Sequence, residues 1–233
     1  MENIKIGNIS FGKKPRIVAI IDDFYPIEKI HWVKNKGADL IEIRVDCLEK
    51  EREAIIRYIK KIRDNIVLPS IGTLRETEFN KQDRLEMFKA VIPLVDAIDI
   101  EIDSDIVTDV IACASEKTII ISEHNYNKTP DIADLDSIVQ TAKRLGADII
   151  KIAAIANSRD DILRLLHFTE TCQENLVSIS MGEVGKVTRV IAPLFGSLFT
   201  YCFIGHEVAS GQLSLEEMVE ELTLFYPDFK ENK

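Results

Sequence analysis

The feature that most constrains the fold is a regular alternation between two kinds of segment. Eight short runs rich in Ile and Val, residues favoured in strands, alternate with longer amphipathic runs typical of helices. Repeated strand-then-helix units produce a parallel sheet covered by helices. Eight such units within 233 residues predict an α/β fold of the (β/α)8 TIM-barrel type.

The expected element boundaries can be read along the chain. We expect strands over residues 16–21, 39–45, 67–74, 96–102, 117–122, 148–153, 176–181 and 197–204. We expect helices over residues 27–36, 51–64, 81–92, 104–114, 131–145, 159–172, 186–191 and 214–225. Asp131 and Gly146 are start and stop signals for one helix, and Ser214 with Glu217 predicts a capping box for the last.

The rival architecture is an open, doubly wound sheet, which usually carries a Gly-rich turn after its first strand. Here residues 21–26 read IDDFYP and contain no glycine. No linker or low-complexity segment divides the chain, so we expect a single domain over residues 1–233. Residues 1–14 are expected to add a β-hairpin, with strands 4–6 and 9–11 about Gly7 and Asn8, that caps the N-terminal face of the barrel.

Charge and cysteine usage narrow the class of partner. The 29 Lys and Arg residues are outnumbered by 39 Asp and Glu, so the formal net charge of -10 argues against nucleic acid or an anionic membrane as the main partner. No apolar stretch is long enough to span a bilayer, and the first residues lack a secretory apolar region. The four cysteines are scattered, with no CxxC pair and no histidine at metal-ligand spacing. We therefore expect a cytoplasmic protein with reduced thiols and no metal site.

Charged residues occur where an inward-facing strand surface is expected. Glu42, Arg44 and Asp46 share one face by the two-residue period of a strand. Buried charges are costly unless they pair or bind a ligand. The alternative is an edge strand with a solvated face, but a closed barrel has no edges. The three charges therefore favour a polar site inside the barrel.

The strand ends supply further candidates, because reactive groups in TIM barrels lie at the C-terminal ends of strands. Arg75 follows the third strand and suits an anion, although a surface loop cation is the alternative. His124 ends the fifth strand and suits acid–base catalysis. His206 is a weaker second candidate, while His31 and His167 lie in predicted helices. The acidic residues of the fourth strand, which are expected to pair with arginines of neighbouring strands, are Asp99, Glu101 and Asp103.

Lys151 lies in the middle of the sixth strand among Ile and Ala residues. A packed lysine usually extends its amine to solvent, but both directions along this strand are apolar. Burial favours the neutral amine, a nucleophile that condenses with a ketone to form an iminium. Such chemistry calls for a carbonyl substrate and needs no metal or organic cofactor.

Two loops after the last strands complete the candidate site. Gly182 and Gly185 would let backbone amides approach an anion, with Arg189 reaching it from the next helix. The alternative is an ordinary turn between strand and helix, where glycines are common. Residues 205–212 form a polar loop suited to a lid over the barrel mouth.

In these segments the chain resembles the type I 3-dehydroquinate dehydratases over nearly its whole length. Residues 42–46 (EIRVD) are similar to the family's E-x-R-x-D strand, and residues 122–126 (SEHNY), followed by Thr129 and Pro130, to its histidine segment. Residues 148–153 (DIIKIA) resemble its lysine strand, and residues 181–189 (MGEVGKVTR) resemble M-G-x-x-G-x-x-S/T-R.

The resemblance implies a lyase of the shikimate pathway that dehydrates 3-dehydroquinate to 3-dehydroshikimate, without a cofactor, as a cytoplasmic homodimer. It places the Schiff-base lysine at Lys151 and the catalytic histidine at His124. It also implies that Arg189 binds the substrate carboxylate. The other substrate contacts that it implies are Glu42, Arg44, Arg75 and Gln212.

The chain departs from the family pattern at two points. After the third strand the family has R-x-x-x-E-G-G, whose glutamate orients the histidine; here Phe79 stands at that position, and Glu78 is expected to hydrogen-bond His124 instead. In the lid the family has S/T-A-P-G-Q, where this chain has Val208 in place of the hydroxyl residue and keeps Gln212.

Two other functions stay open on the sequence. A Schiff-base barrel of the class I aldolase kind would share the lysine and should show a phosphate site near the last two strands. A non-catalytic binding barrel is the second alternative, supported by the departures at Phe79 and Val208.

Overall fold

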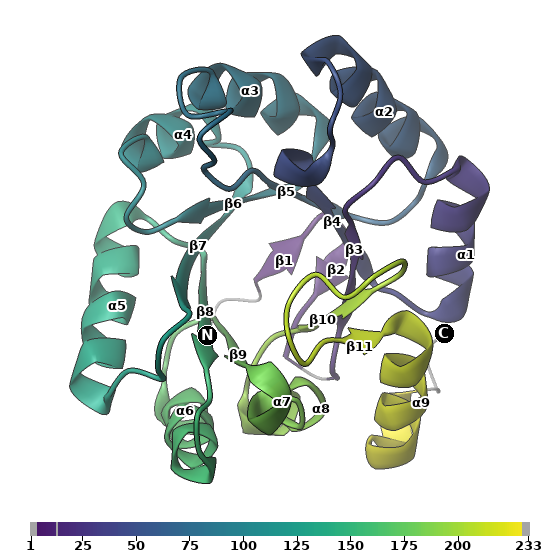
Figure 1. Cartoon of the computed structure of the whole chain (residues 1–233). Helices are drawn as coiled ribbons and strands as arrows, with labels where there is room; N and C mark the ends of the chain where they lie inside the picture. Colours follow the sequence, from purple (N-terminus) through teal and green to yellow (C-terminus); the bar gives the residue numbers. More distant parts are fainter. Residues whose placement is uncertain (1–3, 13, 230–233) are drawn as a thin grey trace.

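A curled parallel sheet surrounded by helices forms the body of the computed structural model, which describes residues 4–12 and 14–229 (Figure 1). Within these residues, nine parallel strands follow the order β11-β10-β3-β4-β5-β6-β7-β8-β9. Strands β3 to β10 correspond to the eight predicted strands, and β11 is a short addition beside β10. The predicted TIM-barrel fold is confirmed.

The elements alternate as the sequence predicts. The strands of the large sheet are β3 Ile17–Ile21, β4 Leu40–Arg44, β5 Ser70–Thr73, β6 Ala97–Glu101, β7 Thr118–Asn125, β8 Ile149–Ile155, β9 Leu176–Met181, β10 Thr200–Phe203 and β11 Leu213–Ser214. The α-helices are α1 Ile27–Lys36, α2 Arg52–Asn65, α3 Arg84–Val91, α4 Val107–Cys113, α5 Ile132–Leu145, α6 Arg159–Thr171, α7 Gly182–Gly185, α8 Thr188–Ile191 and α9 Leu215–Phe225. Short 3-10 helices are η1 Val45–Cys47, η2 Ile92–Leu94, η3 Ala192–Phe195 and η4 Pro227–Phe229.

The sheet has a seam between β9 and β10, which are not paired as a ladder in the described residues. The backbone N–H of Leu198 donates to the carbonyl of Leu176 at this seam (2.9 Å). Strand β10 begins at Thr200, three residues later than predicted, because the Ser197 hydroxyl accepts a hydrogen bond from the Ser178 backbone (3.1 Å). The Ser178 backbone N–H thus donates to a side chain, and it is not available for a backbone ladder between β9 and β10.

Alternate residues of each strand face two separate apolar cores. Outward residues such as Ile41 and Ile43 pack beneath the helices, whereas inward residues such as Leu40 and Ile149 fill the barrel interior. The two-residue period of a strand produces this division. Apolar inward residues fill the N-terminal half of the barrel, and polar ones, including Lys151 two positions after Ile149, begin in the C-terminal half.

The predicted N-terminal hairpin is confirmed, with β1 Lys5–Ile6 antiparallel to β2 Ile9–Ser10. Ile6 is fully buried in the barrel's inner core, and the Phe11 ring lies 5.4 Å from that of Phe199. Figure 1 shows the hairpin at the centre of the ring of strands. It closes the N-terminal end, as expected. Residues 1–3 and 13 of the predicted 1–14 segment, and residues 230–233 of the predicted domain, lie outside the described residues.

The helix signals were correct in two places, and in a third the helix begins later than predicted. Asp131 caps α5 by accepting from the Asp134 amide, and Ser214 with Glu217 forms the predicted capping box of α9. The helix predicted over residues 186–191 forms as α8 Thr188–Ile191, which begins two residues later than predicted. A second short helix, α7 Gly182–Gly185, precedes it after a break. The Thr188 hydroxyl explains the break, because it donates to the Gly185 carbonyl (2.8 Å) while accepting from the Ser180 amide (3.1 Å).

Among the described residues, no helix is both long enough and apolar enough to cross a bilayer.

Candidate active site

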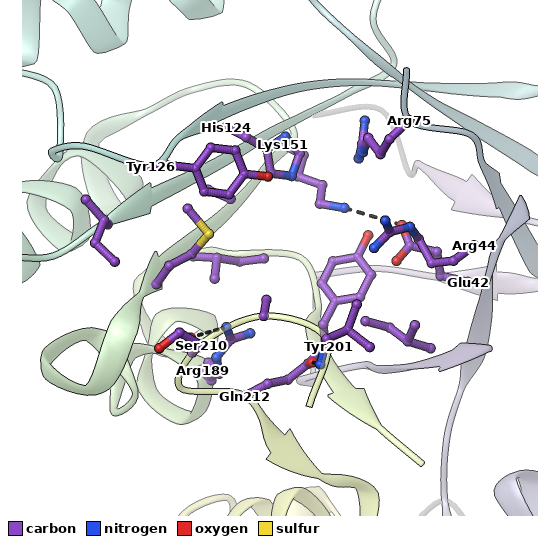
Figure 2. Close-up of a pocket in the computed structure, with 17 residues that line it drawn as sticks. Glu42, Arg44, Arg75, His124, Tyr126, Lys151, Arg189, Tyr201, Ser210 and Gln212 are labelled. Atoms are coloured by element: carbon purple, nitrogen blue, oxygen red, sulfur yellow. Dashed lines mark hydrogen bonds and ion pairs between the residues drawn. The ribbon is translucent and has the colours of Figure 1, made fainter. Parts of the chain in front are cut away.

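A cavity of about 330 Å³ opens at the C-terminal ends of the strands and brings the predicted residues together (Figure 2). It is lined by residues of strands β3, β4, β7, β8, β9 and β10 and of the 205–212 loop. Arg75, just beyond β5, and Arg189 of α8 complete the wall. The predicted site residues that line it are Glu42, Arg44, Arg75, His124, Lys151, Arg189 and Gln212. The strand period and the strand ends predicted the positions of the first five residues. Arg189 was predicted from the segment after the seventh strand and Gln212 from the resemblance, and Glu78 is not part of the group.

Lys151 points inward from β8 and is almost entirely buried. Its Nζ lies 2.9 Å from Asp99 Oδ2 and 3.4 Å from Glu42 Oε1, and 4.2 Å from the centroid of the Tyr201 ring. The sequence predicted apolar surroundings for the Lys151 amine, and this prediction is wrong. Its neighbours Ile150 and Ile152 face outward, and the carboxylates that meet it come from β4 and β6.

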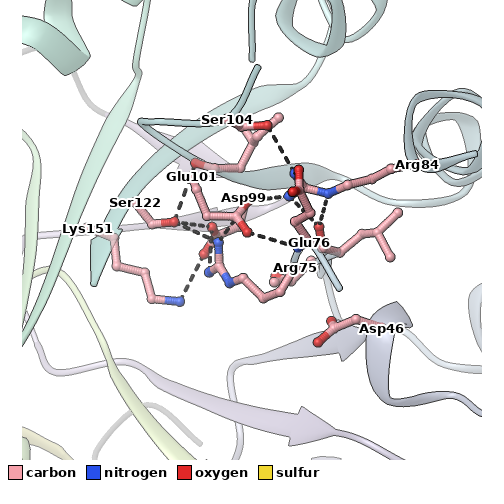
Figure 3. Close-up of polar contacts among 12 residues, drawn as sticks. Asp46, Arg75, Glu76, Arg84, Asp99, Glu101, Ser104, Ser122 and Lys151 are labelled. Atoms are coloured by element: carbon pink, nitrogen blue, oxygen red, sulfur yellow. Dashed lines mark hydrogen bonds and ion pairs between the residues drawn. The ribbon is translucent and has the colours of Figure 1, made fainter. Parts of the chain in front are cut away.

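Asp99 is fully buried at the centre of a network drawn in Figure 3. Arg75 Nη2 lies 2.8 Å from Asp99 Oδ1, the Ser122 hydroxyl donates to Oδ1 (2.7 Å), and Arg75 Nη1 donates to the Ser122 hydroxyl (2.8 Å). Burial by itself raises the pKa of the Asp99 carboxyl, but Arg75 and Lys151 outweigh it and hold that pKa well below its usual range. The expected pairing of Asp99 with a neighbouring arginine is confirmed.

Glu101 also pairs with arginines, as expected for the acidic face of β6. Arg84 Nη2 donates to Glu101 Oε2, and Arg75 Nη1 lies 3.6 Å from the same oxygen. The Arg84 guanidinium is buried and also donates twice to the Leu74 carbonyl (2.9 and 2.7 Å). The sequence did not indicate a role for Arg84, because a charged residue early in a helix resembles an ordinary surface residue. Asp103, the third member of that face, is exposed.

The charges of β4 are satisfied by near neighbours. Arg44 binds the Asp46 carboxylate through Nε (3.1 Å) and Nη2 (2.6 Å), and Glu42 Oε1 accepts from the Thr73 hydroxyl (2.7 Å). Asp46 lies beyond the strand in η1. The two carboxylates of this segment thus have different tasks: Asp46 pairs with Arg44, while Glu42 reaches Lys151.

His124 is the second-last residue of β7, and its neighbour in the β8 register is Ala153, two residues beyond Lys151. Its imidazole borders the cavity and a second, polar hollow of about 380 Å³ on its other side. Burial, helped by the positive charges of Arg75 and Lys151, lowers the pKa of His124 to about 3. The imidazole is therefore neutral at physiological pH and has a free lone pair to accept a proton.

Glu78 does not orient His124. It is exposed, and no hydrogen bond joins it to the imidazole in the described part of the chain. Phe79, at the family's glutamate position, is fully exposed as well. The prediction for Glu78 assumed that the loop after Arg75 is one residue shorter than in the family. Residues 77–80 instead form a turn, which is closed by the Asn80 side chain accepting a hydrogen bond from the Thr77 amide (2.9 Å). His206, the weaker histidine candidate, lines a separate surface hollow.

Arg189 is buried at the cavity wall, and no carboxylate of residues 4–12 or 14–229 pairs with it. Its Nη2 donates weakly to the Ser210 carbonyl (3.4 Å), and its Nε has no hydrogen-bond partner among the described residues. Burial lowers the pKa of Arg189 to about 10, with Glu207 acting in the opposite direction. A buried cation without a counterion is costly, which makes this guanidinium ready to bind an anion.

One of the two glycine amides of the predicted anion cradle is already engaged within the protein. The Gly182 amide donates to the Ser210 carbonyl (3.0 Å), so the 205–212 loop occupies it. The loop lies over the interior of the ring in Figure 1. Within it Gln212 is buried and its Oε1 accepts from the Val208 amide (3.1 Å). The loop, which stays a predicted lid, is therefore fastened to the start of α7, and the Gln212 side chain links its two ends.

Tyr201 of β10 is a polar residue of the cavity that the sequence did not predict. Its inward position was detectable, since it lies two residues after Phe199 on a predicted strand, but one aromatic residue on an inward face normally indicates packing. Across residues 4–12 and 14–229, no group of three or more His, Cys, Asp or Glu side chains is arranged to hold a metal ion.

Comparison with known proteins finds one family repeatedly. The family model described as type I 3-dehydroquinase matches residues 22–228. The 3-dehydroquinate dehydratase of Methanococcoides burtonii is 35% identical, over 95% of this chain and 99% of its own length. That of Methanosarcina barkeri is 36% identical, with the same shares covered.

Solved structures agree with the sequence comparisons. The 3-dehydroquinate dehydratase of Aquifex aeolicus superposes with a TM-score of 0.79 at 33% identity, covering 91% of this chain and 99% of that one. The type I enzyme of Clostridium difficile, solved with covalently modified comenic acid, has a TM-score of 0.85 at 27% identity, covering 96% and 97%. With its barrel, its buried lysine and its strand-end histidine, this chain belongs to the type I 3-dehydroquinase family.

Proposed function

We propose that this protein dehydrates 3-dehydroquinate to 3-dehydroshikimate through a Schiff base on Lys151, with His124 as the base and acid. Family membership gives the reaction, and the chain is accordingly a hydro-lyase. The observation that carries the mechanism is the shared cavity: Lys151 and His124 stand on adjacent strands and both open into it.

The surroundings of Lys151 suit an iminium. The Lys151 ammonium gives up a proton, and the resulting amine attacks the carbon of the substrate ketone. The former ketone oxygen takes up two protons in place of those lost by the nitrogen and leaves as water, so that a positively charged C=N bond stands at the position of the ammonium. Asp99 and Glu42, which pair with the ammonium in the empty site, then face the iminium. Preorganised carboxylates therefore stabilise the charge that the covalent step creates, without reorganisation.

His124 suits the two proton transfers that follow. Its neutral imidazole accepts a proton from the carbon beside the iminium, and the electron pair of that C–H bond moves to give an enamine. The enamine expels the hydroxyl one carbon further, which the imidazolium protonates to water. Hydrolysis of the new iminium releases 3-dehydroshikimate and restores Lys151. Proton transfer by a placed group accelerates reactions by roughly 10²–10⁴-fold.

Arg189 is the residue that we assign to the substrate carboxylate. Arg44 and Arg75 also line the cavity, but they are already paired with Asp46 and Asp99. Arg189 has no ion pair within the described residues and so gains most from an anion. We assign Glu42, Arg44, Arg75 and Gln212 to the substrate hydroxyls and to orientation, because they line the same cavity.

An aldolase acting on a phosphorylated sugar has less support. Such a site needs free backbone amides after the seventh strand, and the Gly182 amide here donates to the Ser210 carbonyl.

Borohydride trapping tests the proposal. Added during turnover of 3-dehydroquinate, borohydride should reduce the imine, inactivate the protein irreversibly and place the added mass on Lys151. Lys151→Ala and the charge-conserving Lys151→Arg should both lose trapping and activity. Lys186→Ala, which changes a lysine outside the cavity, should retain both. Full activity in Lys151→Arg, or trapping only with a phosphorylated sugar, would overturn the assignment.

A further inference from the structure

Tyr201 brings into the cavity a hydroxyl group that no side chain in the described part of the chain engages. It lies at an inward position of β10 with 3% of its surface exposed, and its ring packs edge-on against Phe199 (5.6 Å between centroids). The Oη atom is buried and has no hydrogen-bond partner among the described residues. Leaving a buried hydroxyl unpaired costs about 1–3 kcal/mol, so its partner is expected to come from the contents of the cavity.

The position of this hydroxyl is informative. The Tyr201 ring lies 4.2 Å from Lys151 Nζ, and Figure 2 shows its oxygen pointing into the space bounded by Lys151, Glu42 and Arg75. A ligand joined to Nζ would carry its nearest substituents into that space. The hydroxyl is thus beside the carbon that Lys151 attacks, on the side away from the Arg189 end of the cavity.

The nearby carboxylates do not take this hydroxyl. Glu42 Oε1 already accepts from the Thr73 hydroxyl and from Lys151 Nζ. Asp99 is occupied by Arg75, Ser122 and Lys151. Burial, with the negative charges of Glu42 and Asp99, raises the pKa of the Tyr201 phenol well above its ordinary value. The phenol is therefore protonated at every pH at which the protein works and can act as a hydrogen-bond donor.

We propose that Tyr201 is a specificity-determining residue whose phenol donates a hydrogen bond to the substrate hydroxyl on the carbon beside the ketone, opposite the carbon that loses its proton. The inference rests on the proposed Schiff-base function and adds a contact to it. The class of ligand selected is a cyclic α-hydroxy ketone, because a ketone without that hydroxyl would leave the phenol unpaired in the complex.

The proposal predicts that Tyr201→Phe has different effects on stability and on activity. In the empty protein, Tyr201→Phe removes an unpaired polar atom and keeps the ring against Lys151, so the free energy of unfolding should stay the same or rise. With 3-dehydroquinate, the same change removes a buried hydrogen bond, so kcat/KM should fall about ten- to a hundredfold. If Tyr201 only packed against its neighbours, Tyr201→Phe would not combine an unchanged or higher free energy of unfolding with a lower kcat/KM.

The test compares Tyr201→Phe with Tyr58→Phe. The Tyr58 hydroxyl donates to the backbone carbonyl of Tyr25 (3.0 Å) outside the cavity, so its loss should lower the unfolding free energy and leave kcat/KM unchanged. Both variants are also assayed by borohydride trapping with a ketone analogue that lacks the neighbouring hydroxyl. Tyr201→Phe and the parent should trap this analogue equally well.

The outcomes separate the two proposals. Parental kcat/KM in Tyr201→Phe, or a loss of the same size with the analogue as with the substrate, would overturn the role of Tyr201. If the parent protein itself is not trapped on Lys151 during turnover, the Schiff-base function fails instead. A Tyr201→Phe protein of lowered unfolding free energy would show that the hydroxyl has a structural partner, which also contradicts the proposal.

Discussion

The amine of Lys151 and the carboxylate of Asp99 form a buried ion pair, with Nζ 2.9 Å from Oδ2. Asp99 simultaneously binds Arg75, so one fully buried carboxylate holds two cations of the cavity in place. Buried ion pairs are strongly destabilised when one member is removed, because a charge is left without compensation. The pair therefore links the stability of the barrel to the geometry of its proposed site.

The role of Asp99 can be tested by Asp99→Asn, which keeps the shape and removes the charge. We expect the free energy of unfolding to fall by about 3–5 kcal/mol and activity to be largely lost, because Arg75 and Lys151 lose their shared partner. Chemical denaturation and steady-state assays measure the two effects. Asp103→Asn is the matched control, since Asp103 is an exposed residue near the same strand end. Equal stability of the two variants would contradict the account.

The lowered pKa of His124 predicts an unusual pH dependence. The unfolded chain binds the imidazole proton near pH 6.5, whereas the folded protein binds it only near 3. The stabilising contribution of the neutral imidazole is therefore complete above pH 6.5 and declines as the pH falls toward 3. In the pH profile of kcat/KM, the ionisation that belongs to His124 should likewise appear at a pH far below 6.5. An NMR titration of the His124 ring, compared with exposed His206, should show no protonation between pH 7 and 5. A midpoint near 6.5 would refute the assignment.

Arg189→Met should separate binding from stability. Removing the guanidinium should raise KM for 3-dehydroquinate roughly hundredfold or more, as expected when a charged partner of a buried carboxylate is lost. It should not lower the unfolding free energy of the empty protein, because the buried cation there has no carboxylate partner within the described residues. Lys186→Met, a change outside the cavity in the same segment, should leave KM near the parental value. An unchanged KM in Arg189→Met would place the carboxylate elsewhere.

The fastening of the lid is tested by Gly211→Ala. Gly211 has a φ of 76°, and a Cβ there would lie 2.5 Å from the Gly182 carbonyl oxygen. We expect the lid to shift and KM to rise, because Gln212 is the next residue. Gly146→Ala is the control: its φ is 95°, but no atom lies within 4 Å of its Cβ position. Both changes should cost about 1 kcal/mol of stability for the left-handed backbone. Equal KM values in the two variants would show that the lid tolerates the displacement.

The N-terminal hairpin shows how far local signals extend. Gly7 and Asn8 predicted its turn, and the turn forms between β1 and β2 with Gly7 at a φ of 55°. Turn chemistry and strand period act over a few residues, so they can be read without knowing the partners. The helix predicted over residues 186–191 begins only at Thr188, whose hydroxyl accepts a hydrogen bond from the Ser180 amide on the preceding strand. The predicted homodimer stays a prediction.

The sequence by itself determined the barrel and the inward faces of its strands, and hence that Lys151, His124 and Arg189 would meet at one end. These features follow from periods of two and 3.6 residues, which every strand or helix imposes on its own side chains. Tertiary structure decided which groups surround them. Lys151 meets Asp99, 52 positions away, and Glu42, 109 positions away, because the register of the strands from β4 to β8 brings their inward positions to one depth. The same long-range packing lowers the pKa of His124, leaves Glu78 in solvent and turns the Tyr201 hydroxyl into the cavity. Contacts between distant strands depend on the register and the closure of the sheet, and no local sequence pattern specifies them.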